Sequence, residues 1–417
     1  MSETMTLGVS SETLEKEHQT NTPRVEAPQD GYNLAVGYLR AMVTVLVVAH
    51  HAVLAYFPNA PAPQTALAAE PRLWRAFPVV DSRSWPGFGL FVGFNDTFFM
   101  ALMFFLSGMF VWKSLQRKGS GRFLRDRALR LGLPFVAAAA LLAPLAYYPA
   151  YLQTGAAGMA GFWRQWISQG DWPAGPAWFL WLLLAFDAGA AVLYVILPRW
   201  GEWLGRLSAG AQRRPAVFYA LLVALAVAAY LPLALLLDPF RWTTFGPFSF
   251  QTSRLLHYFV YFLAGAGVGA WGIERGLLSR SGKLASRWMV WVAASLMAYT
   301  LALVVFLMAI SAHGRPYLWG TVGGITFEMS CAASSFAALA LFVRFVKARK
   351  GALESLRENA YGIYVLHYAF VSWLQYALLP APLSGFLKGA LVTVAAVLLS
   401  WGTTASLRRT PAVARVI

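Results

Sequence analysis

One long apolar stretch near the N-terminus carries three side chains that can do chemistry. Residues 34–57 read LAVGYLRAMVTVLVVAHHAVLAYF, which is apolar enough to lie in a bilayer yet includes Arg40, His50 and His51. An ionisable group in a membrane-embedded helix costs about 2.5–3.5 kcal/mol on insertion scales. We therefore expect these side chains to face the inside of a helix bundle and to be there for a chemical reason.

The spacing of Arg40 and His51 places both on one helix face. Eleven residues make three turns plus about 20°, and the two side chains lie about 16 Å apart along the axis. His50 points about 100° away from His51, and we predict a structural role for it. An imidazole, with an ordinary pKa of about 6.5, suits general-base chemistry when burial keeps it neutral. His51 is therefore the predicted catalytic residue, with Arg40 on the same face toward the cytoplasmic side, unless Arg40 snorkels to the headgroups.

A second basic group precedes the third apolar run. Residues 122–135 read RFLRDRALRLGLPF, in which Arg127 and Arg130 are spaced i, i+3 and share a face of an α-helix. Paired guanidinium groups suit phosphate or pyrophosphate, because each offers bidentate hydrogen bonds. Arg122 and Arg125 lie just before them and are candidates for the same role. The alternative is that these charges only set membrane topology.

Two acidic residues lie within predicted membrane helices. Asp187 and Glu328 are functional candidates by default, because a buried carboxylate is costly in a bilayer. Either can orient the catalytic histidine or pair with an arginine such as Arg40.

A late aromatic stripe contains another histidine. His367 lies in YGIYVLHYAF, where Tyr361, Tyr364 and Tyr368 recur at helical spacing. Such a stripe is more often packing than ligand contact, but His367 and Tyr364 are possible supporting residues. His257, at the outer end of a predicted helix, is expected at the membrane interface.

The composition defines a membrane protein. Of the 417 residues, 58% are hydrophobic and 12% are charged, whereas soluble proteins have about 25% charged residues. The net charge of +16 comes from short basic loops, so it indicates topology and no nucleic-acid partner. The single cysteine, Cys331, excludes an internal disulfide and a cysteine-based metal cluster. An adjacent His pair cannot converge on one ion from a helix, so no metal is predicted.

The apolar runs predict an all-α polytopic membrane protein of about ten transmembrane helices. They lie at 34–57, 96–115, 129–148, 177–197, 216–237, 256–273, 288–311, 324–345, 361–379 and 385–405. Basic residues concentrate at 113–130, 199–214, 275–287 and 344–357. By the positive-inside rule these loops and both termini are cytoplasmic. We expect a disordered cytoplasmic tail at 1–30, a membrane domain at 31–407 and a short cytoplasmic tail at 408–417.

Two outward segments are rich in aromatic residues. The longest outer loop covers residues 58–95, and a shorter one reads FWRQWISQGDWPAGPAWF. Their aromatics suit the headgroup region, and the alternative is an acceptor-binding mouth. Ser107 and Gly108 are expected to allow close helix packing. No internal repeat is visible, which argues mildly against many secondary-transporter folds.

Taken together, these stretches resemble the acyltransferase-3 family of membrane O-acyltransferases. YLRAMVTVLVVAHH carries an R-x10-H pattern at Arg40 and His51, and RFLRDRALRLGLPF carries R-x-x-R at Arg127 and Arg130. Weaker similarity is found in WFLWLLLAFD, HYFVYFLAGAGVG and ENAYGIYVLH, so the resemblance spans most of residues 34–405. FNDTFFMALMFFLSG is similar to the branch of periplasmic-glucan succinyltransferases. No appended SGNH-type domain is visible, so acceptor selectivity is expected to come from the membrane domain.

The resemblance implies transfer of an acetyl or succinyl group from cytoplasmic acyl-CoA to a hydroxyl of a carbohydrate, in the bacterial inner membrane. It implies His51 as the catalytic histidine and the three arginines Arg40, Arg127 and Arg130 as donor-binding residues. Direct attack with His51 as general base and a covalent acyl-histidine both remain open, as does the oligomeric state. Membrane lipid is the other expected partner.

Two other functions compete with this interpretation. A proton-coupled transporter or flippase would use the buried Arg, His, Asp and Glu residues as a relay. An enzyme of the other membrane-bound O-acyltransferase superfamily would place its histidine late in the chain, where His367 is the candidate.

Overall fold

The computed structural model describes residues 33–311, 314 and 316–417. The predicted tail at 1–30 lies outside these residues. The described chain is an all-α, multi-pass membrane protein, in which eight helical segments are long and apolar enough to cross a bilayer. The helices are α1 (Leu34–Val53), α2 (Gly87–Gly108), α3 (Val111–Arg127), α4 (Leu133–Ala137), α5 (Ala143–Gln153), α6 (Met159–Ser168), α7 (Trp178–Ile196), α8 (Trp200–Ser208), α9 (Pro215–Leu237), α10 (Leu255–Trp271), α11 (Lys283–Ser286), α12 (Trp288–Ser311), α13 (Pro316–Phe345), α14 (Gly351–Ala377), α15 (Gly385–Leu407) and α16 (Pro411–Ala414).

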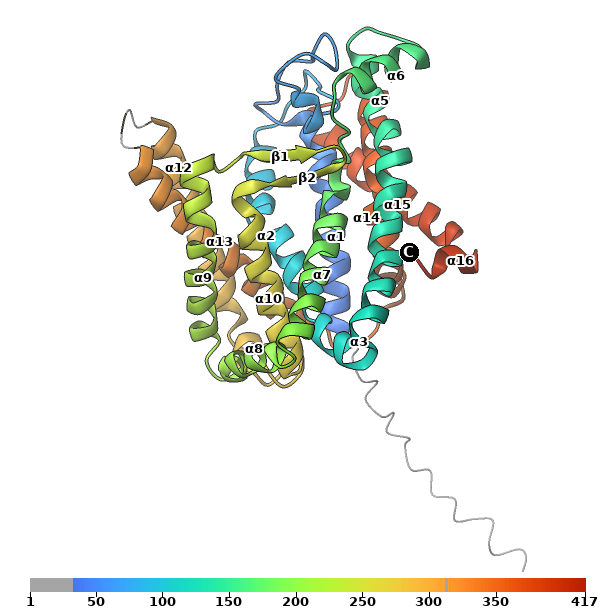
Figure 1. Cartoon of the computed structure of the whole chain (residues 1–417). Coiled ribbons are helices and arrows are strands. Elements are labelled where there is room, and N and C mark those ends of the chain that lie inside the picture. The colour runs from blue at the N-terminus through green and yellow to red at the C-terminus, as the bar shows by residue number, and fades with distance from the viewer. Residues whose placement is uncertain (1–32, 312–313, 315) are drawn as a thin grey trace, which may run out of the picture. The chain divides into compact units, whose positions relative to one another are not determined.

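Two further helices complete the ten predicted segments. The 17-residue α10 packs between α2 and α8, and α14 packs against α1 and α15. They correspond to the predicted segments 256–273 and 361–379. A two-stranded antiparallel hairpin, β1 (Trp242–Phe245) and β2 (Phe248–Gln251), pairs Trp242 with Gln251 and lies between α9 and α10 (Figure 1).

Several predicted boundaries were wrong. The predicted segment 96–115 is α2, which begins nine residues earlier at Gly87 and ends at Gly108. The predicted outer loop at 58–95 therefore extends too far, and Asp96, which lies inside the helix, pairs with Arg254 of the segment before α10 at 2.7 Å. The basic segment predicted as a loop is instead helical, since it forms α3.

The helix that follows α2 is irregular. Residues 111–153 run through α3, a π-helical turn at Ala128–Gly132, α4, a second π turn at Ala138–Leu142, and α5. Gly119 interrupts α3 with φ 70° and ψ 165°, a backbone conformation that favours glycine. Single π turns, such as the two at Ala128–Gly132 and Ala138–Leu142, change the direction of side chains along a helix and often occur at functional sites.

Small residues bring α2 and α10 into close contact. A Cβ atom on Gly108 would lie 2.1 Å from the carbonyl oxygen of Phe262, and one on Gly265 would lie 2.0 Å from that of Phe105. Gly269 meets Met109 in the same way at 1.9 Å. The predicted close packing at Gly108 is therefore confirmed, and it holds α2 in place behind α1.

The two ends of the helix bundle differ in their residues. The basic end contains residues 113–130, 199–214, 275–287 and 344–357, linked by contacts such as Arg280 to the Val346 carbonyl and Trp112 to Trp200. The opposite end contains residues 58–86, 154–177 and 238–254, linked by Trp172 N–H to the Gly246 carbonyl. Figure 1 shows α8 near one end and α6 with the hairpin near the other. That the basic end is cytoplasmic stays a prediction.

Candidate active site

The catalytic histidine predicted in α1 meets the late histidine of α14. His51 Nδ1 lies 3.2 Å from His367 Nε2, although the two residues are 316 positions apart in the chain. His367 is fully buried, whereas His51 is half-buried. Gln375 of α14 donates hydrogen bonds to the carbonyls of His51 and Ala52 at 2.9 and 3.0 Å. The end of α1 is thereby fixed to α14.

The backbone sets the tautomer of both rings. His51 Nδ1 lies 2.8 Å from the Val47 carbonyl, and His367 Nδ1 lies 2.7 Å from the Tyr364 carbonyl. A carbonyl oxygen can only accept, so Nδ1 carries the proton in each ring. His367 Nε2 then accepts from His51 Nδ1–H, and His51 Nε2 is left as an unprotonated nitrogen. This is the atom that can take a proton from a hydroxyl group.

Arginines gather on the basic-end side of this pair. Arg127 and Arg357 are the nearest cations to Arg40, and Tyr361 of α14 lies near both Arg40 and Arg130. The Tyr361 hydroxyl donates to the Arg130 carbonyl. The Arg40 side chain also lies 6.0 Å from the ring centre of Phe110. Arg40 therefore lies near Arg127, but the Arg40 side chain is exposed rather than facing the inside of the bundle, and its shared role with the R-x-x-R pair stays a prediction.

Arg127 and Arg130 do not form the simple shared face that an α-helix predicts. The π turn begins at Ala128, between them, so the i, i+3 argument does not apply there. Arg127 turns toward Asp187, with Nε 3.3 Å from Oδ2. Arg130 is exposed, and Arg122 and Arg130 both lie near Asp126, which is ion-paired to Lys118. Arg125 is exposed as well.

Asp187 and Glu328 take different roles from those first considered. Asp187 is fully buried and pairs with Arg127. The expected pairing of Asp187 with an arginine is therefore confirmed, but the arginine is Arg127 and not Arg40. Glu328 pairs with His257, Oε1 to Nδ1 at 2.7 Å, and therefore does not orient His51. His257 is itself buried among protein side chains, and its expected place at the membrane interface stays a prediction.

The His257 group is also the one candidate set of metal donors in the described part of the chain. Donor atoms of His257, Glu328 and Cys331 all lie within 4.8 Å of one another. Glu328 faces Nδ1 of the ring, whereas Cys331 Sγ lies 4.0 Å from Nε2. The carboxylate and the thiol therefore face different ring nitrogens, an arrangement better suited to a hydrogen-bonded triad than to one tetrahedral ion.

His50 belongs to a different environment from His51. Its ring stacks on Phe99 at 5.1 Å, and its nearest charged groups are Asp96 and Arg254. Its buried Nδ1 has no hydrogen-bond partner among the described residues. His50 and His51 therefore lie in different surroundings, as the sequence predicts. The structural role of His50 stays a prediction.

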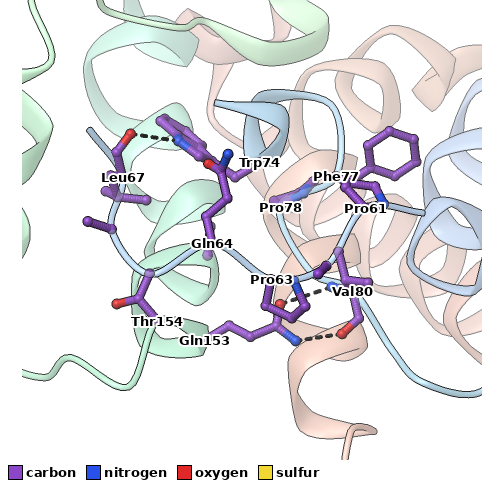
Figure 2. A pocket seen from close by; sticks show the side chains of 13 residues that line it. Pro61, Pro63, Gln64, Leu67, Trp74, Phe77, Pro78, Val80, Gln153 and Thr154 are labelled. Atoms are coloured by element: carbon purple, nitrogen blue, oxygen red, sulfur yellow. Dashed lines mark hydrogen bonds between the residues drawn. The ribbon is translucent and has the colours of Figure 1, made fainter. Parts of the chain in front are cut away.

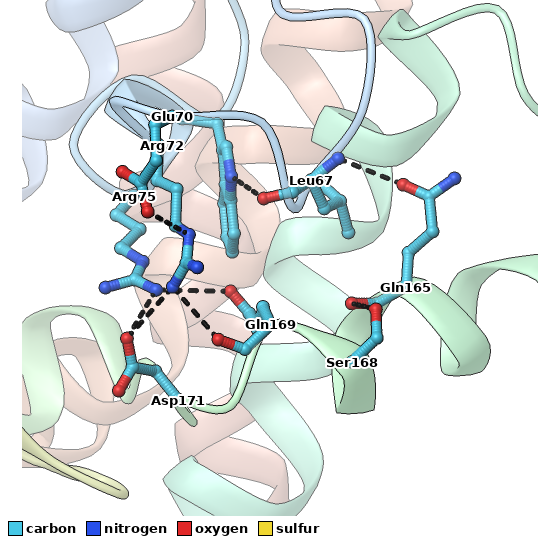
Figure 3. A network of polar contacts seen from close by, with 9 residues as sticks. Leu67, Glu70, Arg72, Arg75, Gln165, Ser168, Gln169 and Asp171 are labelled. Carbon is cyan, nitrogen blue, oxygen red and sulfur yellow. Dashed lines mark hydrogen bonds and ion pairs between the residues drawn. The ribbon is translucent and has the colours of Figure 1, made fainter.

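An ion-pair network holds the outer loop in place. Arg72 and Arg75 both contact Asp171 Oδ2, at 3.2 and 2.8 Å, and Arg72 also contacts Glu70 at 2.9 Å. Figure 3 shows these groups converging beside Gln169. At the other end of the loop, Asp81 forms a fully buried ion pair with Lys388 of α15 at 2.6 Å.

A chain of aromatic contacts leads from this loop to His51. Trp74 packs edge-on against Tyr147 at 5.1 Å, Tyr147 against Tyr368 at 5.6 Å, and Tyr368 against His51 at 5.2 Å. The Tyr147 hydroxyl also donates to the Arg75 carbonyl at 2.9 Å. The loop of residues 58–86 therefore lies directly over the histidine pair at the opposite end of the bundle.

Two hollows flank these contacts. One is lined by prolines of the outer loop, Trp74, Phe77 and Gln153, and Figure 2 shows Gln153 bound to the backbone of Val80 there. Trp74 is buried and its indole N–H donates to the Leu67 carbonyl, so it is neither at the headgroups nor free to stack on a ligand. The second, a small hollow, borders His367 and Tyr368.

Three residues that surround the histidine pair were not predicted from the sequence as site residues. Gln375, Tyr147 and Tyr368 lie at or beside the histidine pair. Tyr368 belonged to the tyrosine stripe, which was its signal. Gln375 lies eight residues after His367, two helical turns on the same face, which would have indicated it.

Comparison with known families identifies the class of protein. The family model described as an acyltransferase domain matches residues 33–405, and the chain belongs to that family. Searches of curated proteins and of solved structures gave no match.

Proposed function

We propose that the protein transfers an acetyl or succinyl group from cytoplasmic acyl-CoA to a hydroxyl of a surface or periplasmic glycan in the bacterial inner membrane. Membership of the acyltransferase family supports the transfer of an acyl group. The observation that carries the proposal is the His51 ring, whose Nδ1 proton is held by Val47 and His367 so that Nε2 is available as a base.

During the reaction His51 accepts one proton and then gives it up. Nε2 takes the proton of the acceptor hydroxyl while the oxygen attacks the thioester carbonyl, forming the new C–O bond. The C–S bond then breaks, and the CoA thiolate leaves with the proton from the imidazolium. His367 Nε2, 3.2 Å from His51 Nδ1, stabilises the imidazolium by accepting a hydrogen bond. General-base help of this kind contributes about 10²–10⁴-fold.

The donor is proposed to enter from the basic end. Arg40, Arg127 and Arg130 would bind the phosphates of CoA, with exposed Arg122 and Arg125 at the mouth. Guanidinium groups bind phosphate through charge-assisted bidentate hydrogen bonds. The acyl end of the donor would then point toward His51, because Arg40 lies about 16 Å before it on the same helix.

The acceptor is proposed to approach from the opposite end. The loop of residues 58–86 is tied to Asp171 and Lys388 and contacts the histidine pair through Tyr147 and Tyr368. A glycan hydroxyl on that side would reach His51 without crossing the bundle. The rival transporter would also use a path through the bundle but would release no CoA.

The direct test compares glycans from cells with and without the gene. Mass spectrometry of surface and periplasmic glycans should show an acyl mass that depends on the gene. Purified protein mixed with acyl-CoA and these glycans should release CoA only when both are present. Transport of a glycan or lipid without CoA release from any acyl-CoA would contradict the proposal and favour the transporter.

A further inference from the structure

A partly exposed carboxylate lies inside α2, in a part of the molecule that the proposed mechanism does not use. The Asp96 side chain is 45% exposed, although it lies nine residues, about 14 Å, into this membrane-spanning helix. A carboxylate that faced hydrocarbon would be costly. The exposed side of Asp96 therefore borders an opening that water can reach, in the half of α2 nearer the loop of residues 58–86.

Arg254 fixes Asp96 without using all of its carboxylate. Arg254 Nη2 donates to Asp96 Oδ2 at 2.7 Å, and Nη1 donates to the Asp96 backbone carbonyl at 3.1 Å. Arg254 is itself buried, with its guanidinium carbon 4.8 Å from the ring centre of Phe327. Asp96 Oδ1 has no hydrogen-bond partner in the part of the chain that the structure describes. The carboxylate is therefore held in place with one oxygen free to accept a hydrogen bond.

The neighbouring amide also lacks a partner. Asn95 is buried, and its Nδ2 makes no hydrogen bond to any described residue. Phe99 follows Asn95 by four residues and Asp96 by three, so the three side chains share one side of α2. His50 of α1 stacks on Phe99 at 5.1 Å, and its ring centre is 5.4 Å from that of His51. The His50 ring therefore lies between this polar pair and the proposed base.

The free groups of this pair match the hydroxyls of a sugar. Asp96 Oδ1 can only accept a hydrogen bond and the Asn95 amide nitrogen can only donate one, whereas a hydroxyl group does both. Neighbouring hydroxyls on one sugar ring can therefore satisfy both side chains. An anionic group would find no free cation here, because Arg254 is buried and already paired with Asp96.

We propose that Asn95 and Asp96 bind hydroxyl groups of the acceptor beside the one that is acylated, and that Arg254 positions Asp96 for this contact. This inference rests on the proposed function, and it adds the residues that select the acceptor. The part of the acceptor next to the reacting hydroxyl is then uncharged and carries at least one further hydroxyl. The close packing of α2 and α10 at Gly108 and Gly265 keeps the two sides of this site together.

The test measures acyl transfer in membranes from labelled acetyl-CoA or succinyl-CoA to glycan extracted from cells that lack the gene. Asp96→Asn should raise KM for the glycan about 10- to 100-fold, and Asn95→Ala about 3- to 10-fold, from the usual values of charged and neutral hydrogen bonds. KM for the acyl-CoA should stay unchanged in both variants. Thr97→Val is the matched control, because the Thr97 hydroxyl donates to the Gly93 carbonyl of its own helix. It should change neither KM.

A double variant separates binding from folding. Asp96→Asn leaves Arg254 without its counter-charge, so it is compared with Asp96→Asn/Arg254→Gln. The double variant should regain the thermal stability that Asp96→Asn loses, but it should keep the high KM for the glycan. Recovery of the glycan KM in the double variant would assign the ion pair a purely structural role and overturn the inference.

The remaining outcomes separate this inference from the proposed function. If the wild-type protein released no CoA from either acyl-CoA in the presence of the glycan, the proposed function and this inference would both fail. If wild-type transfer were normal and the glycan KM were unchanged in Asp96→Asn and Asn95→Ala, the inference alone would fail. An equal rise in KM for the glycan and for the acyl-CoA would also overturn the inference alone.

Discussion

Two histidines of the helix bundle, His51 and His257, have contrasting surroundings. His51 is half-buried, and its partner is the neutral ring of His367. His257 is fully buried, with a carboxylate at 2.7 Å and a thiol at 4.0 Å. His367, the partner of His51, borders a hollow, whereas Glu328 and Cys331 lie on a helix packed within the bundle.

We propose that the difference separates a reactive site from a structural one. A base must be reachable and must have an unprotonated nitrogen, which the geometry of His51 provides. The buried His257 ring lies 2.7 Å from the Glu328 carboxylate, and this pair joins α10 to α13 by a contact that costs much to break. Burial of an ionisable residue in a membrane bundle is thus not by itself a sign of catalysis.

The largest effect is expected in the His51–His367 pair. His51→Ala should lower kcat/KM for acyl transfer about 10²–10⁴-fold, and His367→Ala about tenfold, because His367 only supports the ring. The double variant should be no worse than His51→Ala, since residues that act as a unit are not additive. Initial rates of transfer in membranes, corrected for folded protein, check this. A double variant far below His51→Ala would show that His367 acts independently.

The second prediction concerns the His257 group. Glu328→Ala leaves His257 without its buried partner and should lower the free energy of unfolding by about 3–5 kcal/mol. Thermal or denaturant unfolding in detergent measures the change. His257→Phe combined with Glu328→Leu should recover most of the loss, because it removes both polar partners. If Glu328→Ala lost as much activity per folded molecule as His51→Ala, the two histidine sites would not differ in role.

The third prediction tests the arginine cluster. Arg127→Gln should raise KM for acyl-CoA about 10- to 100-fold, as expected for losing a hydrogen bond to a charged group, with a smaller change in kcat. Because this variant leaves Asp187 unpaired, Arg127→Gln should be compared with Arg127→Gln/Asp187→Asn. The double variant should regain stability but not donor affinity. Recovery of KM in the double variant would assign Arg127 a purely structural role.

The smallest effect is expected at the opposite end. Asp171→Asn removes the charge that Arg72 and Arg75 share, but these side chains are partly exposed, so the change in the free energy of unfolding should be under about 1 kcal/mol. Acyl transfer should change by less than about threefold. A large loss of transfer with stability intact would place the loop in acceptor binding, and unfolding curves with rates measured on one preparation distinguish these results.

Local patterns predicted the parts of the fold that depend on one segment. The apolar run of α1 and the eleven-residue spacing of Arg40 and His51 follow from helix geometry alone. Hydropathy likewise located α7, α9, α12 and α15 to within a few residues. The start of α2 was missed, because the residue that makes Asp96 tolerable in a helix is Arg254, 158 positions away.

Partner choice was the part that the sequence could not predict. Asp187, Glu328 and His367 were all identified as candidates, but only tertiary packing decides which cation or ring each one meets. The pairs Asp187–Arg127, Glu328–His257 and His367–His51 join helices far apart in the chain. The π turn at Ala128–Gly132 was also not predicted, since four of its five residues are ordinary helix formers.

The most direct test of the central claim compares the two histidines in one assay. Acyl transfer from labelled acyl-CoA to glycan would be measured in membranes containing wild-type protein, His51→Ala or His257→Ala, each normalised to folded protein. We expect His51→Ala to lose nearly all transfer and His257→Ala to retain it per folded molecule. Full transfer by His51→Ala would rule out His51 as the base.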